Sequence, residues 1–74
     1  MISDINIAKQ ISDMMTTVFS QITESISMVK ENCTPEDAAA YKRALGRLLG
    51  AIVMDVLEPL YERNPALKPA DWDD

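Results

Sequence analysis

Histidine is absent from this 74-residue chain, and there is a single cysteine. Histidine is the commonest metal ligand and the usual acid or base near neutral pH, so its absence removes much catalytic and metal-binding chemistry. Cys33 has no partner for an internal disulfide and no histidine to activate it, so we expect a small, buried or half-buried thiol. Paired catalytic carboxylates and a Gly-rich loop are also missing. We therefore expect no enzyme activity, no metal and no cofactor.

A signal peptide and a membrane-spanning run are not apparent either. Residues 1–6 have no basic start and no apolar run, unlike a secretory leader. The most apolar stretch, residues 44–60, is interrupted by Arg47 and Asp55 and reaches Pro59, a pattern that a membrane helix tolerates poorly. The sequence therefore predicts a cytoplasmic protein that does not enter the membrane.

Positive charge is scarce. The chain has 7 Lys and Arg residues against 12 Asp and Glu residues, a net charge of −5, which repels nucleic acid and anionic membrane surfaces. Lys42, Arg43 and Arg47 nevertheless lie close together, so an alternative function is a nucleic-acid-binding dimeric regulator that uses this face. No aromatic residues alternate with these cations, and we favour a solvated surface for them.

Glycine and proline are missing from residues 3–32, which predicts one long helix over about that range. Apolar side chains recur in it at steps of three and four: Ile7, Ile11, Met15, Val18, Ile22, Ile26, Val29 and Cys33. The steps from Ile11 to Ile22 to Cys33 are eleven residues long. Eleven residues are close to three turns of a straight helix, so marked left-handed supercoiling is not required.

A turn at residues 33–34 separates this helix from a second one. Thr34 can accept a hydrogen bond from the backbone three residues on, and Pro35 fits the first helical position, where no N–H is needed. The second helix is expected over about residues 35–58, and Pro59 predicts a kink or a stop. Its apolar face contains Ala38, Tyr41, Leu45, Leu48, Leu49, Ile52, Val56 and Leu60.

Folding the chain back at this turn brings together residues whose numbers add to about 67. Each apolar residue of one helix then faces an apolar residue of the other, from Val29 with Ala38 near the turn to Ile7 with Leu60 at the far end. Some residues of opposite charge also face each other across the hairpin, such as Lys9 and Glu58. The predicted fold is all-α, an antiparallel two-helix hairpin over residues 1–63.

A hairpin of this size buries little surface, so we expect it to dimerise into a four-helix bundle. Gly46 and Gly50 are costly inside a helix, and a close helix contact would offset that cost. The predicted dimer interface comprises Ala39, Gly46, Gly50, Val53 and Leu57. An antiparallel copy of the second helix, crossing near Ala51, would also bring Arg47 toward Asp55 and Arg43 toward Glu58.

Residues 64–74 contain two prolines and end in acidic residues, which predicts an extended tail. Leu67 and Trp72 either fold back over the end of the bundle or, with Asp73 and Asp74, bind a groove of a partner protein. From these features we expect a small non-enzymatic interaction or regulatory protein. It would act as a homodimeric helical bundle and bind another, unidentified protein through the bundle surface or the tail.

Overall fold

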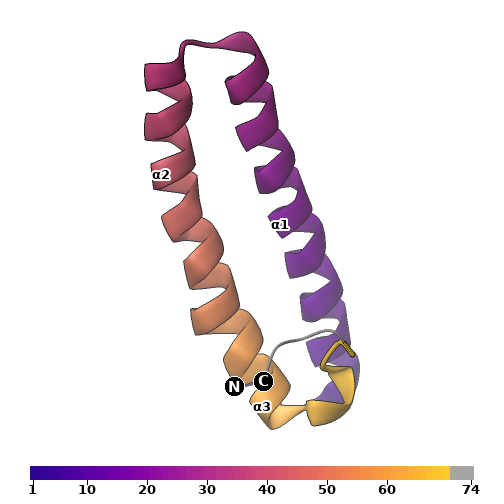
Figure 1. Cartoon of the computed structure of the whole chain (residues 1–74). Helices are drawn as coiled ribbons and strands as arrows, with labels where there is room; N and C mark the ends of the chain where they lie inside the picture. Colours follow the sequence, from indigo (N-terminus) through magenta and orange to yellow (C-terminus); the bar gives the residue numbers. More distant parts are fainter. Residues whose placement is uncertain (71–74) are drawn as a thin grey trace.

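The structure is a computed structural model that describes residues 1–70, in which all regular secondary structure is helical and no strand occurs. The elements are α1 (Ile5–Asn32), α2 (Pro35–Ala51), a π-helix, η1 (Ile52–Leu57), α3 (Glu58–Arg63) and a short 3₁₀ helix, η2 (Pro65–Leu67). Figure 1 shows α1 and α2 side by side and antiparallel, joined at one end by the turn at Cys33 and Thr34. In the part of the chain described, no helix is both long and apolar enough to cross a membrane.

Side-chain caps define where both long helices begin. The Asp4 carboxylate accepts hydrogen bonds from the backbone N–H groups of Asn6 (2.9 Å) and Ile7 (3.1 Å), so α1 starts at Ile5. The Thr34 hydroxyl oxygen accepts a bond from the Asp37 N–H at 3.1 Å, and Pro35 occupies the first position of α2. Each cap satisfies N–H groups that have no partner within the helix.

Burial along α1 follows a seven-residue pattern rather than the eleven-residue pattern of the sequence. The buried and half-buried residues are Ala8, Ile11, Ser12, Met15, Val18, Phe19, Ile22, Ser25, Ile26 and Val29. In heptad notation they occupy positions a, d and e, with Ala8, Met15, Ile22 and Val29 at a. Cys33 would be the next residue at position e, but it follows the end of α1, and its thiol is exposed rather than buried or half-buried.

The second arm widens into a π-helix as it approaches Pro59. The Glu58 N–H donates to the carbonyl of Val53, five residues earlier. Proline has no N–H to donate, and in an α-helix its ring would clash with the carbonyl four residues before it. A π turn holds one more residue than an α turn, so it rotates everything that follows by about 100°.

This rotation changes which side chains of the second arm face α1. The first buried residue of the second arm is Ile52, and the next is Leu57, five residues later. Leu60, Tyr61 and Asn64 are buried after it. Leu60 and Ala8 are both 0% exposed. The predicted pairing of Ile7 with Leu60 is therefore wrong, because Ile7 is 46% exposed.

Near the turn the predicted register agrees with the structure. The hydroxyl groups of Ser25 and Tyr41 are hydrogen-bonded at 2.9 Å, and their numbers add to 66. Leu48, which the same rule places opposite Phe19, is 48% exposed. The predicted register therefore fails at Leu48, and it also fails at the buried pair of Ser12 and Tyr61, whose numbers add to 73.

The chain after α3 is tied to the open end of the hairpin. The Asn64 side-chain amide donates to the carbonyls of Ile2 (2.7 Å) and Leu60 (3.2 Å). Residues 65–67 form a 3₁₀ turn rather than the extended chain that was predicted, and Leu67 packs against the core. Trp72, Asp73 and Asp74 lie outside the described residues, so the choice between fold-back and partner binding stays open for them.

The Thr34 cap predicts a difference between two neighbouring substitutions. Thr34→Ala removes the acceptor for the Asp37 N–H and is expected to lower the free energy of unfolding by about 1 kcal/mol. Pro35→Ala keeps the cap and should have a smaller effect. Urea unfolding followed by circular dichroism measures both, and equal losses would contradict the assignment of the cap.

Candidate interaction surface

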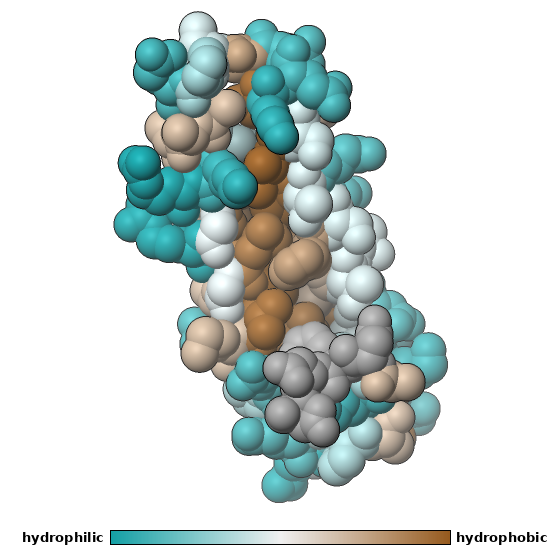
Figure 2. Space-filling model, viewed as in Figure 1, coloured by the Kyte–Doolittle hydropathy of each residue, from teal (hydrophilic) through white to brown (hydrophobic). Residues whose placement is uncertain are grey.

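One broad face of the hairpin is open and carries small or apolar side chains from both helices. Figure 2 shows it as an apolar column between the helices, flanked by pale, weakly polar residues. We call it the groove face and define it by Thr16, Phe19, Ser20 and Ile26 of α1, Ala39, Gly46 and Gly50 of α2, and Val53 of η1. The residues of the second arm recur at steps of seven, four and three, which place them on one side of the helix.

Two hollows lie at opposite ends of this face. The hinge hollow, about 430 Å³, is lined by Ile26, Lys30, Cys33, Pro35, Ala38, Ala39 and Lys42. The second hollow, about 220 Å³, is lined by Thr16, Phe19, Ser20, Val53, Leu57, Tyr61 and Pro69. Gly46 and Gly50 lie between them along α2, so the groove face is continuous from one hollow to the other.

The two glycines leave open space. Outside the adjacent residues and the backbone of its own helix, a Cβ atom added at Gly46 or at Gly50 would meet no atom within 4 Å. Contact within one chain therefore does not explain why glycine stands at these positions. The space above them is free to accept side chains from another molecule.

Threonine hydroxyl groups beside the groove face are already hydrogen-bonded within α1. Thr16 donates to the Ser12 carbonyl at 2.9 Å, and Thr23 donates to the Phe19 carbonyl at 3.0 Å. Threonine bonded in this way does not need water or a ligand to satisfy its hydroxyl group. The surface can therefore be covered by apolar groups without leaving these donors unsatisfied.

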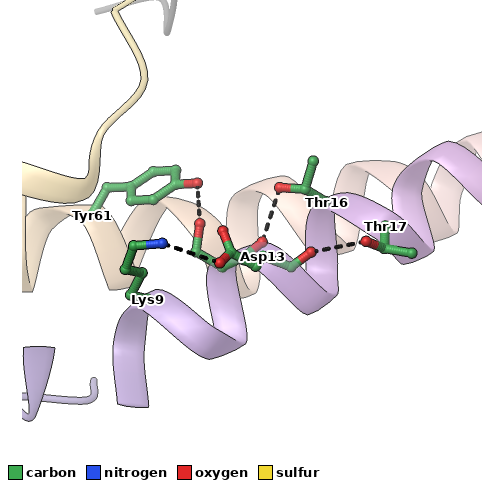
Figure 3. Close-up of polar contacts among 6 residues, drawn as sticks. Lys9, Asp13, Thr16, Thr17 and Tyr61 are labelled. Atoms are coloured by element: carbon green, nitrogen blue, oxygen red, sulfur yellow. Dashed lines mark hydrogen bonds and ion pairs between the residues drawn. The ribbon is translucent and has the colours of Figure 1, made fainter. Parts of the chain in front are cut away.

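Polar pairs inside the hairpin hold the two arms in place beneath this face. Figure 3 shows the Tyr61 ring extending to α1, where its hydroxyl oxygen lies 2.7 Å from that of Ser12 in a buried hydrogen bond. Nearer the turn, Ser25 donates to the Ile22 carbonyl at 2.7 Å, so Tyr41 is the donor in the Ser25–Tyr41 bond. Buried hydroxyl pairs fix one alignment of two apolar surfaces that could otherwise slide.

Charged residues form few contacts in the chain. Within residues 1–70 the ion pair is between Lys9 and Asp13 at 3.3 Å, so Lys9 does not pair with Glu58 as the register suggested. Arg43 and Arg47 are exposed, whereas Lys42 lines the hinge hollow. The described residues contain no group of three or more acidic or cysteine side chains arranged to hold a metal ion.

Four of the five predicted interface residues lie on the groove face. Leu57 is 4% exposed and belongs to the core of a single chain, although it also lines the second hollow of this face. Its place in a dimer interface stays a prediction. The sequence reasoning also missed the contribution of α1, although Thr16, Ser20, Thr23 and Ser27 recur at steps of three and four as a stripe of small side chains.

No model of a known protein family matches this chain. Comparison with curated proteins and with solved structures likewise gives no significant match. Function is therefore inferred from the geometry of the molecule itself.

The buried Ser12–Tyr61 bond predicts coupling between two distant positions. Tyr61→Phe should lower the free energy of unfolding by about 1–2 kcal/mol, because it leaves the buried Ser12 hydroxyl group unsatisfied. Adding Ser12→Ala should cost less than the sum of the two single changes. Tyr41→Phe, at the half-buried pair, is the matched control with a smaller expected loss, and strictly additive effects at Ser12 and Tyr61 would argue against the bond.

Proposed function

We propose that this chain is a non-enzymatic interaction or regulatory protein that works as a homodimer, in which two hairpins close across the groove face into a four-helix bundle. The observation that supports this most directly is the surface that one chain leaves exposed. Its accessible area is 5426 Å², whereas a folded monomer of 8.2 kDa has about 4,500 Å² by the usual scaling. The excess is therefore about 900 Å².

An excess of this size is close to one partner's share of a standard protein interface, about 800 Å². The shape of the chain agrees with this, since its radius of gyration is 14.6 Å, against about 11 Å for a compact domain of this length. Covering one face with a second copy would bring the exposed area of each chain near the value of an ordinary monomer.

The distribution of buried residues supports the same assembly. The buried residues of the described chain belong to the open half of the hairpin: Ala8, Ser12, Ile52, Leu57, Leu60, Tyr61 and Asn64. The half nearer the turn has only half-buried apolar side chains, such as Ile26 and Leu45. An antiparallel second copy would place its well-packed open end beside this half.

Charge along the second arm favours that antiparallel arrangement. Arg43 and Arg47 precede Asp55 and Glu58, and all four are exposed without an ion pair in the described chain. A two-fold axis near Ala51 brings each arginine toward a carboxylate of the other copy. Two-fold symmetry is also the commonest symmetry of homodimers.

The opposite face of the hairpin suits a different protein. Exposed apolar side chains stand at heptad position g of α1, where Met14 is 59% exposed and Met28 is 62% exposed, with Ile7 in the same column. Position g lies across the seam from position e, which supplies Phe19 and Ile26 to the groove face. Flexible methionine side chains recur on surfaces that bind other proteins. We assign partner binding to this Met face, defined by Ile7, Met14 and Met28.

Gly50→Leu tests the homodimer. A Cβ atom at this position meets no neighbouring element within one chain, so the variant should keep its helical circular dichroism and lose the dimer. Analytical ultracentrifugation should give twice 8.2 kDa for the natural protein and 8.2 kDa for the variant.

The matched control is Gln10→Leu, which adds the same side chain at the exposed, outward position c of α1. It should leave the dimer mass unchanged. A natural protein that sediments as a monomer at high concentration, or a Gly50→Leu variant that remains dimeric, would refute the groove face as the interface.

The assignment of the Met face predicts that substitutions there abolish partner binding without affecting the dimer. Met14→Lys combined with Met28→Lys should preserve helicity and dimer mass, because neither residue lies on the groove face. In a pull-down from the native cell, a protein retained by the natural chain and by Met54→Lys, another exposed methionine, should be lost with the double variant. Equal retention by all three would remove this face as the binding surface.

A further inference from the structure

An exposed apolar side chain of α2 borders the Met face. Leu48 is 48% exposed, and it stands two residues from Gly46 and two from Gly50. Two residues correspond to about 200° of rotation in an α-helix, so Leu48 lies on the side of α2 that is turned away from the groove face. Ala44 and Ala51, four residues before Leu48 and three after it, lie on the same side. The second arm therefore adds apolar surface beside the Met face.

Acidic side chains surround Met28 at the end of this surface nearer the turn. Glu24 and Glu31 stand four residues before Met28 and three after it, so they are its neighbours on the surface of α1. Both are exposed, and neither forms an ion pair within residues 1–70. Their carboxylates are therefore available to a cationic group of another molecule.

Asp37 borders Met28 from the other arm. It precedes Leu48 by eleven residues, about three helical turns, so it lies on the same side of α2. The bond between Ser25 and Tyr41 sets a local register in which the numbers of facing residues add to 66, and this places Asp37 level with the residue after Met28. Asp37 is exposed and, in the described part of the chain, has no ion-pair partner. Carboxylates thus stand on both sides of Met28.

The lysines near the turn lie on the opposite side of the hairpin. Lys30 follows Met28 by two residues, and it lines the hinge hollow of the groove face together with Lys42. Arg43 and Arg47 lie farther from the turn, and the proposed homodimer directs them toward carboxylates of the other copy. Negative charge is therefore left beside the Met face. A surface complementary to it has apolar side chains bordered by lysine or arginine.

The spacing along the Met face matches a helix rather than an extended chain. Ile7 and Met14 are seven residues apart and Met14 and Met28 are fourteen, so these side chains recur at multiples of about 10.5 Å along α1. A helix that lies alongside presents one face at the same seven-residue interval. Side chains on one face of a β-strand recur at about 6.7 Å, which does not match this interval.

We infer that the partner of the Met face binds it with a basic amphipathic helix. The apolar side chains of that helix pack against Met14, Met28 and Leu48. Its flanking lysine or arginine side chains pair with the carboxylates around Met28. The net charge of −5 attracts such a cationic helix to the chain. This inference rests on the assignment of partner binding to the Met face and adds the chemistry of the partner.

Binding of three designed peptides to the full chain tests the inference. The lysine peptide is three heptads long, with leucine at positions a and d and lysine at e and g. The glutamate peptide has glutamate in place of each lysine, and the rearranged peptide has the residues of the lysine peptide in an order that does not place the leucines on one face. Fluorescence anisotropy should show binding of the lysine peptide alone, and circular dichroism should show a gain of helix on binding.

Charge reversal locates the binding surface. Glu24→Lys combined with Glu31→Lys should weaken binding of the lysine peptide by about tenfold and should strengthen binding of the glutamate peptide. The matched control is Asp13→Lys combined with Glu62→Lys, which changes the net charge equally but in the open half of the hairpin. This control should cause a much smaller change, because exposed charges at a distance are screened by salt. Dimer mass and helicity are measured on the same samples.

The outcomes separate this inference from the proposed function. If the Met14→Lys, Met28→Lys variant loses a cellular partner but the natural chain does not bind the lysine peptide, the inference is wrong and the Met face remains the binding surface. Equal binding of the rearranged peptide, or equal weakening by the two charge-reversed variants, would also overturn the inference. A cellular partner retained by the methionine variant would reject both proposals.

Discussion

The missing N–H of Pro59 is the constraint on which the arrangement of the hairpin depends. To accommodate the ring, the second arm forms a π turn, and that turn rotates the following residues by about 100°. Leu57, Leu60 and Tyr61 then face α1. In this arrangement the Tyr61 hydroxyl group reaches Ser12 in a buried hydrogen bond at the open end of the molecule.

The two faces of the hairpin, on either side of the seam of buried residues, are chemically different. Position e of α1, together with the small residues of α2, forms a smooth groove face with internally satisfied threonines. Position g carries exposed methionines. The hairpin therefore presents two exposed faces of different chemistry.

Local patterns in the sequence were sufficient to predict the two long helices and where they begin. Thr34 and Pro35 act as a cap and a first position because these roles depend only on neighbouring backbone groups. Pro59 predicted an interruption of the second helix. Whether the helix kinks, stops or widens there depends on the packing of Leu60 and Tyr61 across the hairpin. The inward rotation of Leu57 and the α1 side of the groove face could not be obtained from spacing alone, since they follow from that choice.

The bond from Asn64 to the Ile2 carbonyl joins the two arms at the end where a hairpin usually frays. The buried side chains of the described residues lie in the same half, whereas the half near the turn is only partly covered. Local opening is therefore expected first in the half near the turn, while the bond between Asn64 and Ile2 keeps the other ends of the two arms together.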